Sequence, residues 1–230
     1  MKTLGIVGGL GPESTVDYYR LIIAAYREQK PDGSCPAIII NSIDLNKARN
    51  LVTANALADL TEYLVAEVRR LARAGADFGL LTASTPHIVF DDVRRQSPIP
   101  LLSIVEATCE AAKALGLKRL GLLGTKFTMQ GRFFPDVFER AGMTLTVPTE
   151  DEQAYIHEKY MGELVNGIFL SETRQGLLEI VERLKRQEGI EGVILGGTEL
   201  PLILRDAAFR DIPFLDTTRI HVQSAVLQML

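Results

Sequence analysis

The sequence predicts an α/β protein built from two similar doubly wound lobes, each with a parallel sheet. Two observations carry this prediction. Short apolar runs alternate with segments of helical periodicity along the 230 residues, and one part of the first half recurs in the second. Because the short runs are apolar throughout rather than alternating, we expect parallel strands that are covered on both faces.

The repeat is visible in the residues themselves. Residues 2–8, Lys-Thr-Leu-Gly-Ile-Val-Gly, are echoed 116 positions later by residues 118–124, Lys-Arg-Leu-Gly-Leu-Leu-Gly. A polar turn around Ala83 recurs around Gly197, 114 positions later. Solenoid repeats run to about 20–50 residues, so a period this long indicates one duplicated domain.

In the first half, strands are expected at 3–8, 37–41, 78–82 and 101–103, where three to six mainly apolar residues lie between turn residues. Helices are expected where apolar residues recur every three or four positions, at 14–29, 54–74 and 104–115. Gly75 ends the second of these helices, as glycine often does.

The second half repeats this order, with expected strands at 119–124, 144–147, 192–195 and 214–215. The same helical periodicity appears at 131–141, 151–166, 171–187 and 218–229. Ser171 is expected to supply a hydroxyl cap at the start of its helix.

The boundary between the lobes is expected near residues 97–100, Ser-Pro-Ile-Pro, where two prolines punctuate the chain. We therefore expect a first lobe of residues 1–100 and a second lobe of residues 101–207. The last segment, 208–230, is expected to pack back and complete the first lobe.

Composition excludes several classes of function. The net charge of -4 has no basic cluster interleaved with aromatic residues, so nucleic acid is not an expected partner. No apolar run approaches the ~18 residues of a membrane span, and we expect no signal segment before the first strand. Cys35 and Cys109 form neither a CxxC pair nor a disulfide framework. We expect a soluble cytoplasmic protein.

Polar turns follow the apolar strands, and ligands of open α/β sheets bind beyond the carboxyl ends of the strands. The turns that meet this description are 8–15, 41–44, 82–87, 124–128 and 196–199. The glycine-containing turns 8–15 and 124–128 offer backbone N–H groups at a helix N-terminus, which suits a carboxylate or phosphate. Neither has dinucleotide or phosphate-loop spacing, so no nucleotide cofactor is expected, and simple tight turns are the alternative.

Thr82, Ser84 and Thr85 gather three hydroxyls at one strand end, where they either hold an amino acid or cap the following helix. His87 is either a base or a hydrogen-bonded structural histidine. Glu199 is either a site carboxylate or an acid in the first turn of a helix. With three separated histidines and no HxxxH pair, no metal site is expected.

Several of these segments together resemble the aspartate/glutamate racemase superfamily, whose members work without pyridoxal phosphate. The segments that carry the resemblance are 8–15, 83–87, 122–125 with 128–129, 196–199, and 216–217 with 220–221, and they span nearly the whole chain. The resemblance implies two similar α/β lobes with the active site between them, a small acidic amino acid or dicarboxylate as ligand, no cofactor, and a homodimer.

The resemblance breaks at the family's two catalytic thiols. The family pattern Cys-Asn-Thr-x-His lies over residues 83–87, and its pattern Gly-Cys-Thr-Glu lies over residues 196–199. Ala83 and Gly197 therefore take the cysteine positions, and neither offers a titrating group. Thr82, Glu199 and His87 are the nearest candidates for a replacement acid or base.

The same resemblance implies a set of substrate-binding residues: Gly9, Ser14, Arg49, Ser84, Thr85, Thr125, Thr128 and Thr198. Arg49 is the best placed cation for a distal carboxylate, which arginine holds through two parallel hydrogen bonds. A surface arginine in an ordinary loop is the alternative.

Three hypotheses for the function follow. The first is an amino-acid racemase, an isomerase, with both thiols replaced. The second is a lyase, decarboxylase or isomerase of another kind on the same scaffold, using the glycine-rich turns to stabilise an oxyanion. The third is a non-catalytic protein that binds an amino acid or dicarboxylate. Fold alone does not choose among them.

Overall fold

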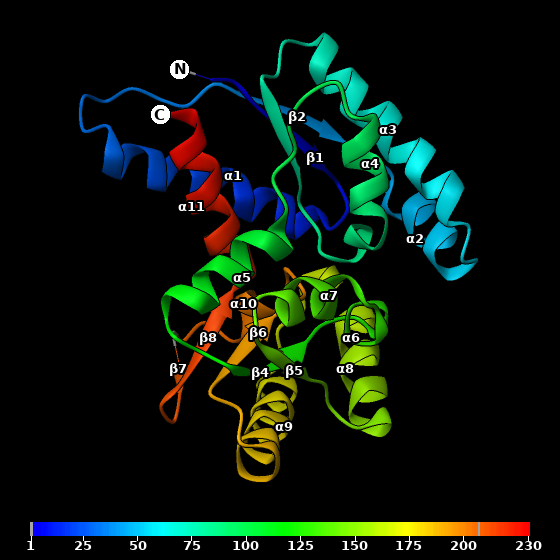
Figure 1. Ribbon diagram of the computed structural model, residues 1–230, viewed down its shortest axis with the longest axis vertical. Helices are drawn as coiled ribbons and strands as arrows, with labels where there is room; N and C mark the ends of the chain where they lie inside the picture. Colours follow the sequence, from blue (N-terminus) through cyan, green and yellow to red (C-terminus); the bar gives the residue numbers. More distant parts are fainter. Residues whose placement is uncertain (1, 207) are drawn as a thin grey trace. The chain divides into compact units, whose positions relative to one another are not determined.

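The computed structural model describes residues 2–206 and 208–230, and they form two compact units (Figure 1). The first unit contains the described residues up to Ile104 together with His221–Leu230, and the second contains Val105–Ile220. Met1 and Ala207, which end two of the expected lobe ranges, lie outside the described residues.

The first unit is a parallel sheet in the order β2-β1-β3. Its elements, in chain order, are β1 (Leu4–Gly8), α1 (Pro12–Gln29), β2 (Ile38–Ser42), α2 (Leu45–Thr53), α3 (Leu57–Arg73), β3 (Phe78–Leu81), the 3-10 helix η1 (Thr85–Val89) and α4 (Phe90–Gln96). β1 and β3 are buried along their whole length, as the uninterrupted apolar runs predict.

The second unit contains the sheet β5-β4-β6-β8-β7, in which only the β7–β8 pair is antiparallel. Its elements are α5 (Ile104–Ala114), β4 (Arg119–Leu123), α6 (Lys126–Gln130), α7 (Phe133–Arg140), β5 (Thr144–Thr146), α8 (Glu150–Gly162), η2 (Leu164–Asn166), α9 (Ser171–Glu188), β6 (Gly192–Leu195), α10 (Leu200–Ile203), β7 (Ala208–Phe209), β8 (Ile212–Asp216) and α11 (Thr217–Met229), whose last residues belong to the first unit.

The two sheets share one topology. β1 lies between β2 and β3, and β4 lies between β5 and β6, so the first strand of each unit is flanked by its second and third. Leu4 is in register with Ile38 and Phe78 on its two sides. The two-lobed α/β fold with parallel sheets is therefore confirmed, and the sequence repeat corresponds to this shared strand order.

The unit boundaries differ from the expected ones. Residues 208–220 were expected to complete the first lobe, but β8 pairs in parallel with β6, so this segment belongs to the second unit. The first unit extends to Ile104 because Leu101 forms a parallel bridge to Gly79. The expected strand 101–103 is reduced to this bridge, and proline at 98 and 100 removes two N–H donors beside it.

The expected helix 54–74 is α3, and α2 precedes it as a separate helix. Asp44 caps α2 by accepting a hydrogen bond from the Asn46 N–H at 2.8 Å. Asn55 has a φ of 52°, a left-handed conformation that interrupts the helical backbone between α2 and α3. The sequence pattern missed α2 because its apolar face is narrow, with Ala48 and Val52 the only buried residues.

The C-terminal helix completes the core of the first unit. Val222, Ala225, Val226 and Met229 of α11 pack in one cluster with residues of α1, β1 and β3. Figure 1 shows α11 and α1 on one face of this sheet and α3 on the other. The expected return of the chain to the first lobe therefore occurs, but only from His221 onward.

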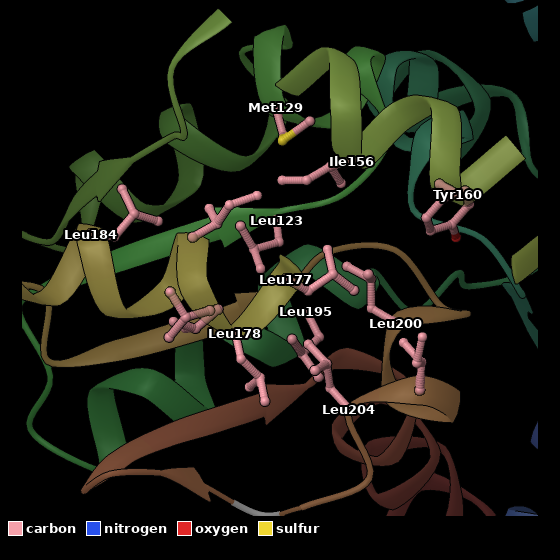
Figure 2. Packing of buried hydrophobic residues seen from close by; sticks show 14 of the residues in the cluster. Leu123, Met129, Ile156, Tyr160, Leu177, Leu178, Leu184, Leu195, Leu200 and Leu204 are labelled. Atoms are coloured by element: carbon pink, nitrogen blue, oxygen red, sulfur yellow. The ribbon is translucent and has the colours of Figure 1, made fainter. Parts of the chain in front are cut away.

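The core of the second unit joins its sheet to α8, α9 and α10. Figure 2 shows Leu123 and Leu195 from the strands packed beside Leu177 and Leu178 of α9. Within residues 2–206 and 208–230, no helix has the length and apolarity to cross a membrane.

We predict that Met229→Ala lowers the free energy of unfolding by ~2–5 kcal/mol, because the side chain is 1% exposed and its loss leaves a cavity in the first unit. Leu227→Ala on the same helix is the control, since Leu227 is 70% exposed and should change stability by less than about 0.5 kcal/mol. Urea denaturation measures both. Equal effects of the two substitutions would contradict the packing of α11 into this core.

Candidate functional site

In the first unit, the turns after β1 and β3 are joined by hydroxyl groups. Ser14 Oγ donates to the Thr82 carbonyl at 3.0 Å, and the hydroxyls of Thr15 and Thr82 lie 3.2 Å apart. Thr15 reaches this position because Gly8 has no side chain: a Cβ there would lie 2.6 Å from Thr15 Cγ2. The structure thus brings Ser14 and Thr82, two of the predicted site residues, into one buried cluster.

Gly9 shapes the same turn. Its φ is +80°, a conformation that glycine adopts without strain, and a Cβ would lie 2.7 Å from the Ile43 nitrogen. The Gly9 N–H donates to Thr15 Oγ1 at 2.9 Å. The N–H that the sequence suggested for a ligand is therefore used within the turn.

Ala83, Ser84 and Thr85 follow the end of β3. Ala83 and Ser84 are buried, and Thr85 is half-buried at the start of η1. Ser84 Oγ has no hydrogen-bond partner among the described residues, although the side chain is only 3% exposed. A buried hydroxyl without a partner is costly, so this oxygen is a strong candidate for a ligand contact.

His87 is held at both ring nitrogens. Nδ1 lies 3.1 Å from the Ala83 carbonyl, and Nε2 accepts the Ile104 N–H at 3.3 Å, which together require a neutral ring with the proton on Nδ1. Burial lowers the pKa of His87 to about 3. The His87 ring stacks on the Phe90 ring, with 4.6 Å between the ring centroids. This geometry favours a residue that fixes the turn over a residue that removes a proton.

In the second unit, the turns after β4 and β6 lie against each other. The Gly196 N–H donates to the Leu123 carbonyl at 2.7 Å. Thr125 caps α6 by accepting the Thr128 N–H, and the two hydroxyls lie 3.1 Å apart. A Cβ on Gly124 would lie 2.9 Å from Thr128 Cγ2, so Thr128 takes the same place beside β4 that Thr15 takes beside β1.

The turn after β6 contains Gly197, Thr198 and Glu199, all buried. The Tyr160 hydroxyl donates a short hydrogen bond to Glu199 Oε2, and Thr198 Oγ1 donates to the same oxygen at 3.1 Å. Burial, followed by the charge of Glu199, raises the pKa of Tyr160 well above its ordinary value. The turn thus holds a buried carboxylate and a phenol that keeps its proton.

Other predicted groups lie elsewhere. Arg49 is exposed on α2, where its Nη2 donates to Asn46 Oδ1 at 2.8 Å. Cys35 is exposed and Cys109 is buried in α5, and both are free thiols. Burial raises the pKa of Cys109, so this thiol is not activated as a base.

Tyr160 is a candidate site residue that the sequence analysis did not identify, because it follows the charged residues Glu158 and Lys159 in the chain. The buried positions of α8 are Gln153, Ile156 and Tyr160, which follow helical spacing. A large aromatic residue on that face, together with a glycine at the expected cysteine position, is the signal from which the pair could have been inferred.

Two α/β lobes of one topology each carry a hydroxyl-bearing turn at the carboxyl ends of their strands, the edge at which open α/β sheets bind ligands. The sequence matches the profile of the Asp/Glu/Hydantoin racemase family over residues 7–225. The chain belongs to this family, which places it among the isomerases.

Three relatives illustrate the similarity. A structure from Yersinia pestis, described as a candidate Asp/Glu racemase, is 30% identical with a TM-score of 0.89, covering 100% of this chain and 99% of that one. An aspartate racemase homologue from Pyrococcus horikoshii is 33% identical with a TM-score of 0.84, with the same coverage. The broad specificity amino-acid racemase RacX of Bacillus subtilis is 22% identical over 97% of this chain and 96% of that protein.

We predict that the free energy of unfolding falls as the pH falls from about 7 toward 4. Burial lowers the pKa of His87 to about 3 and that of His221 to about 4, whereas unfolded histidine titrates at about 6.5. The unfolded chain therefore binds more protons than the folded chain in this range, and folding loses stability.

Urea denaturation at pH 7, 6 and 5 measures this slope, which should be shallower for His87→Gln than for the wild type. His157→Gln is the control, because the His157 ring is only half-buried and should leave most of the slope in place. A slope unchanged by His87→Gln would mean that this ring is not a buried neutral group.

Proposed function

We propose that this protein acts at the α-carbon of a small acidic amino acid of the aspartate/glutamate type, without pyridoxal phosphate. The observation that carries the proposal is the pair of strand-end turns at 82–87 and 196–199. They belong to separate units, yet both follow the third strand of their sheet and both carry buried polar side chains, which are Thr82, Ser84 and His87 in the first turn and Thr198 and Glu199 in the second. The family match favours this function over the lyase, decarboxylase and binding-only alternatives.

The first turn supplies a binding site for charged groups of the amino acid. Ser84 Oγ is a buried hydroxyl without a partner in the described chain. It can therefore donate a hydrogen bond to a carboxylate oxygen of the ligand without breaking an existing hydrogen bond. Ser14, Thr82 and Thr15 hold the backbone of this turn in place. Thr85, Thr125, Thr128 and Thr198 are the further hydroxyls that we propose for the ligand.

In the resemblance drawn from the sequence, Ala83 and Gly197 lie over the family's two cysteines, and neither residue has a thiol. We therefore propose that this chain moves the α-proton with oxygen groups rather than with sulfur. Arg49 is proposed as the partner of the distal carboxylate, because a guanidinium can hold a carboxylate through two hydrogen bonds. From the resemblance alone, we also propose a cytoplasmic homodimer.

Incubation with L-aspartate or L-glutamate in deuterated water tests the function. We predict that deuterium appears at the α-carbon, and mass spectrometry measures its incorporation. Both enantiomers should accumulate if the proton returns on either face. The same amino acid should stabilise the protein, by ~2.7 kcal/mol at a hundredfold excess over Kd. Stabilisation without deuterium incorporation at high enzyme concentration would contradict a catalytic role and leave only binding.

Ser84→Ala separates a ligand-binding hydroxyl from a structural one. The free energy of unfolding without ligand should stay the same or rise, because the lost hydroxyl has no partner in the described residues. The affinity for L-aspartate should fall about tenfold or more, since hydrogen bonds to charged groups contribute roughly 1.5–3 kcal/mol. Ser97→Ala, in the segment before Leu101, is the control, and its affinity should equal that of the wild type. Equal affinity in Ser84→Ala would remove Ser84 from the site.

A further inference from the structure

Gly197 is a glycine for reasons of space rather than of backbone conformation. Its φ lies outside the left-handed region, so an ordinary L-residue would suit the backbone. A Cβ at this position, however, would lie 2.9 Å from both the Tyr160 Cζ and hydroxyl oxygen, and closer still to Cε2. Tyr160 therefore stands in the space that a side chain at position 197 would occupy.

The position of Tyr160 is fixed by the fold. It follows Gln153 and Ile156 on the buried face of α8, a helix whose start is closed by a capping box between Thr149 and Glu152. The tyrosine ring belongs to the core cluster of the second unit, and Figure 2 shows it at the edge of the labelled group. The ring is thus anchored by packing, while the hydroxyl is set beside the turn after β6.

The hydroxyl of Tyr160 both donates and accepts a hydrogen bond. It donates to Glu199 Oε2 and lies 3.4 Å from the Glu199 N–H, which donates to it. Thr198 Oγ1 donates to the same carboxylate oxygen at 3.1 Å. Tyr160 is 5% exposed and Glu199 is 2% exposed, so the hydrogen bond from the phenol to the carboxylate lies in a buried setting.

We propose that Tyr160 is the proton-transferring residue of the second unit and that Glu199 is the acceptor behind it. The proposal rests on the proposed function. The phenol oxygen lies 2.9 Å from where the Cβ of residue 197 would be, and a functional atom borne by that Cβ would lie in the same region. A hydroxyl delivered from α8 thus takes the place of a thiol delivered from the turn.

The transfer balances in protons and charge. The α-proton of the amino acid passes to the Tyr160 oxygen, while the hydroxyl proton of Tyr160 passes to Glu199 Oε2. The electron pair of the broken C–H bond stays on the substrate as a carbanion conjugated with its carboxylate. Glu199 changes from carboxylate to carboxylic acid, and Tyr160 is a neutral phenol before and after. In the return step, Tyr160 gives its proton to the carbanion and recovers one from Glu199.

This arrangement fits the surroundings of the pair. A phenolate at Tyr160 is disfavoured by burial and by the neighbouring carboxylate, and the relay never requires one, because both protons move together. In the proposed relay, the negative charge moves from Glu199, to which Thr198 donates a hydrogen bond, to the substrate. Tyr160 therefore relays the proton, and Glu199 supplies the basicity.

The test measures α-deuterium incorporation into L-aspartate and L-glutamate for the wild type, Tyr160→Phe and Glu199→Gln. Tyr160→Phe keeps the ring that fills the space beside Gly197 and removes only the hydroxyl. We expect each variant to lose exchange by 100-fold or more, as removal of a general acid–base group does, while the melting temperature still rises with added amino acid. Tyr155→Phe on the same helix is the matched control and should exchange at the wild-type rate.

The outcomes are distinct. Exchange by Tyr160→Phe within threefold of the wild type, with ligand stabilisation retained, overturns the relay and leaves the proposed function standing. Absence of exchange in the wild type itself overturns both. Loss of exchange in Tyr160→Phe together with loss of ligand stabilisation assigns the hydroxyl to binding and also overturns the relay. Glu199→Gln keeps the size of the side chain, so it tests the acceptor even if Tyr160→Phe is unstable.

Discussion

Three strand-end glycines determine how the functional turns are built, because each leaves space that a side chain from another element enters. Thr15 occupies that space beside Gly8, Thr128 occupies it beside Gly124, and Tyr160 occupies it beside Gly197. Packing of this kind leaves no room for a Cβ, so these glycines are constrained by their neighbours rather than by backbone conformation.

The first two of these contacts are equivalent by topology. Gly8 and Gly124 stand at the ends of β1 and β4, the central strands of the β2-β1-β3 and β5-β4-β6 sets, and each receives a threonine from the segment that follows. The duplication therefore extends from strand order to individual side-chain contacts. The third contact departs from this symmetry, since Ala83 at the corresponding turn of the first unit carries a side chain of its own, and there the buried Ser84 hydroxyl stays without a partner in the described chain.

Much of the fold could be predicted from the sequence because its signals are local. Apolar runs mark β1, β3, β4 and β6, and the repeated segments 2–8 and 118–124 place equivalent strands at the centre of each sheet. The candidate turns were found for the same reason. The pairing of β8 with β6 and the contact of Tyr160 with Gly197 join residues that are far apart in the sequence. The periodicity of the sequence therefore does not predict them. The hydrogen bond at His87 Nε2 depends on Ile104, which the sequence places in another element.

Tyr160 takes the place of a side chain at position 197, and a double-mutant cycle measured by stability tests whether the two positions share this space. Gly197→Ala, Tyr160→Leu and the double variant are compared with the wild type by urea denaturation. We expect Gly197→Ala to destabilise the wild type strongly but to destabilise the Tyr160→Leu variant much less, with a coupling energy above ~1 kcal/mol. Effects that add within about 0.5 kcal/mol would show that the two positions do not share this space, and would contradict the account.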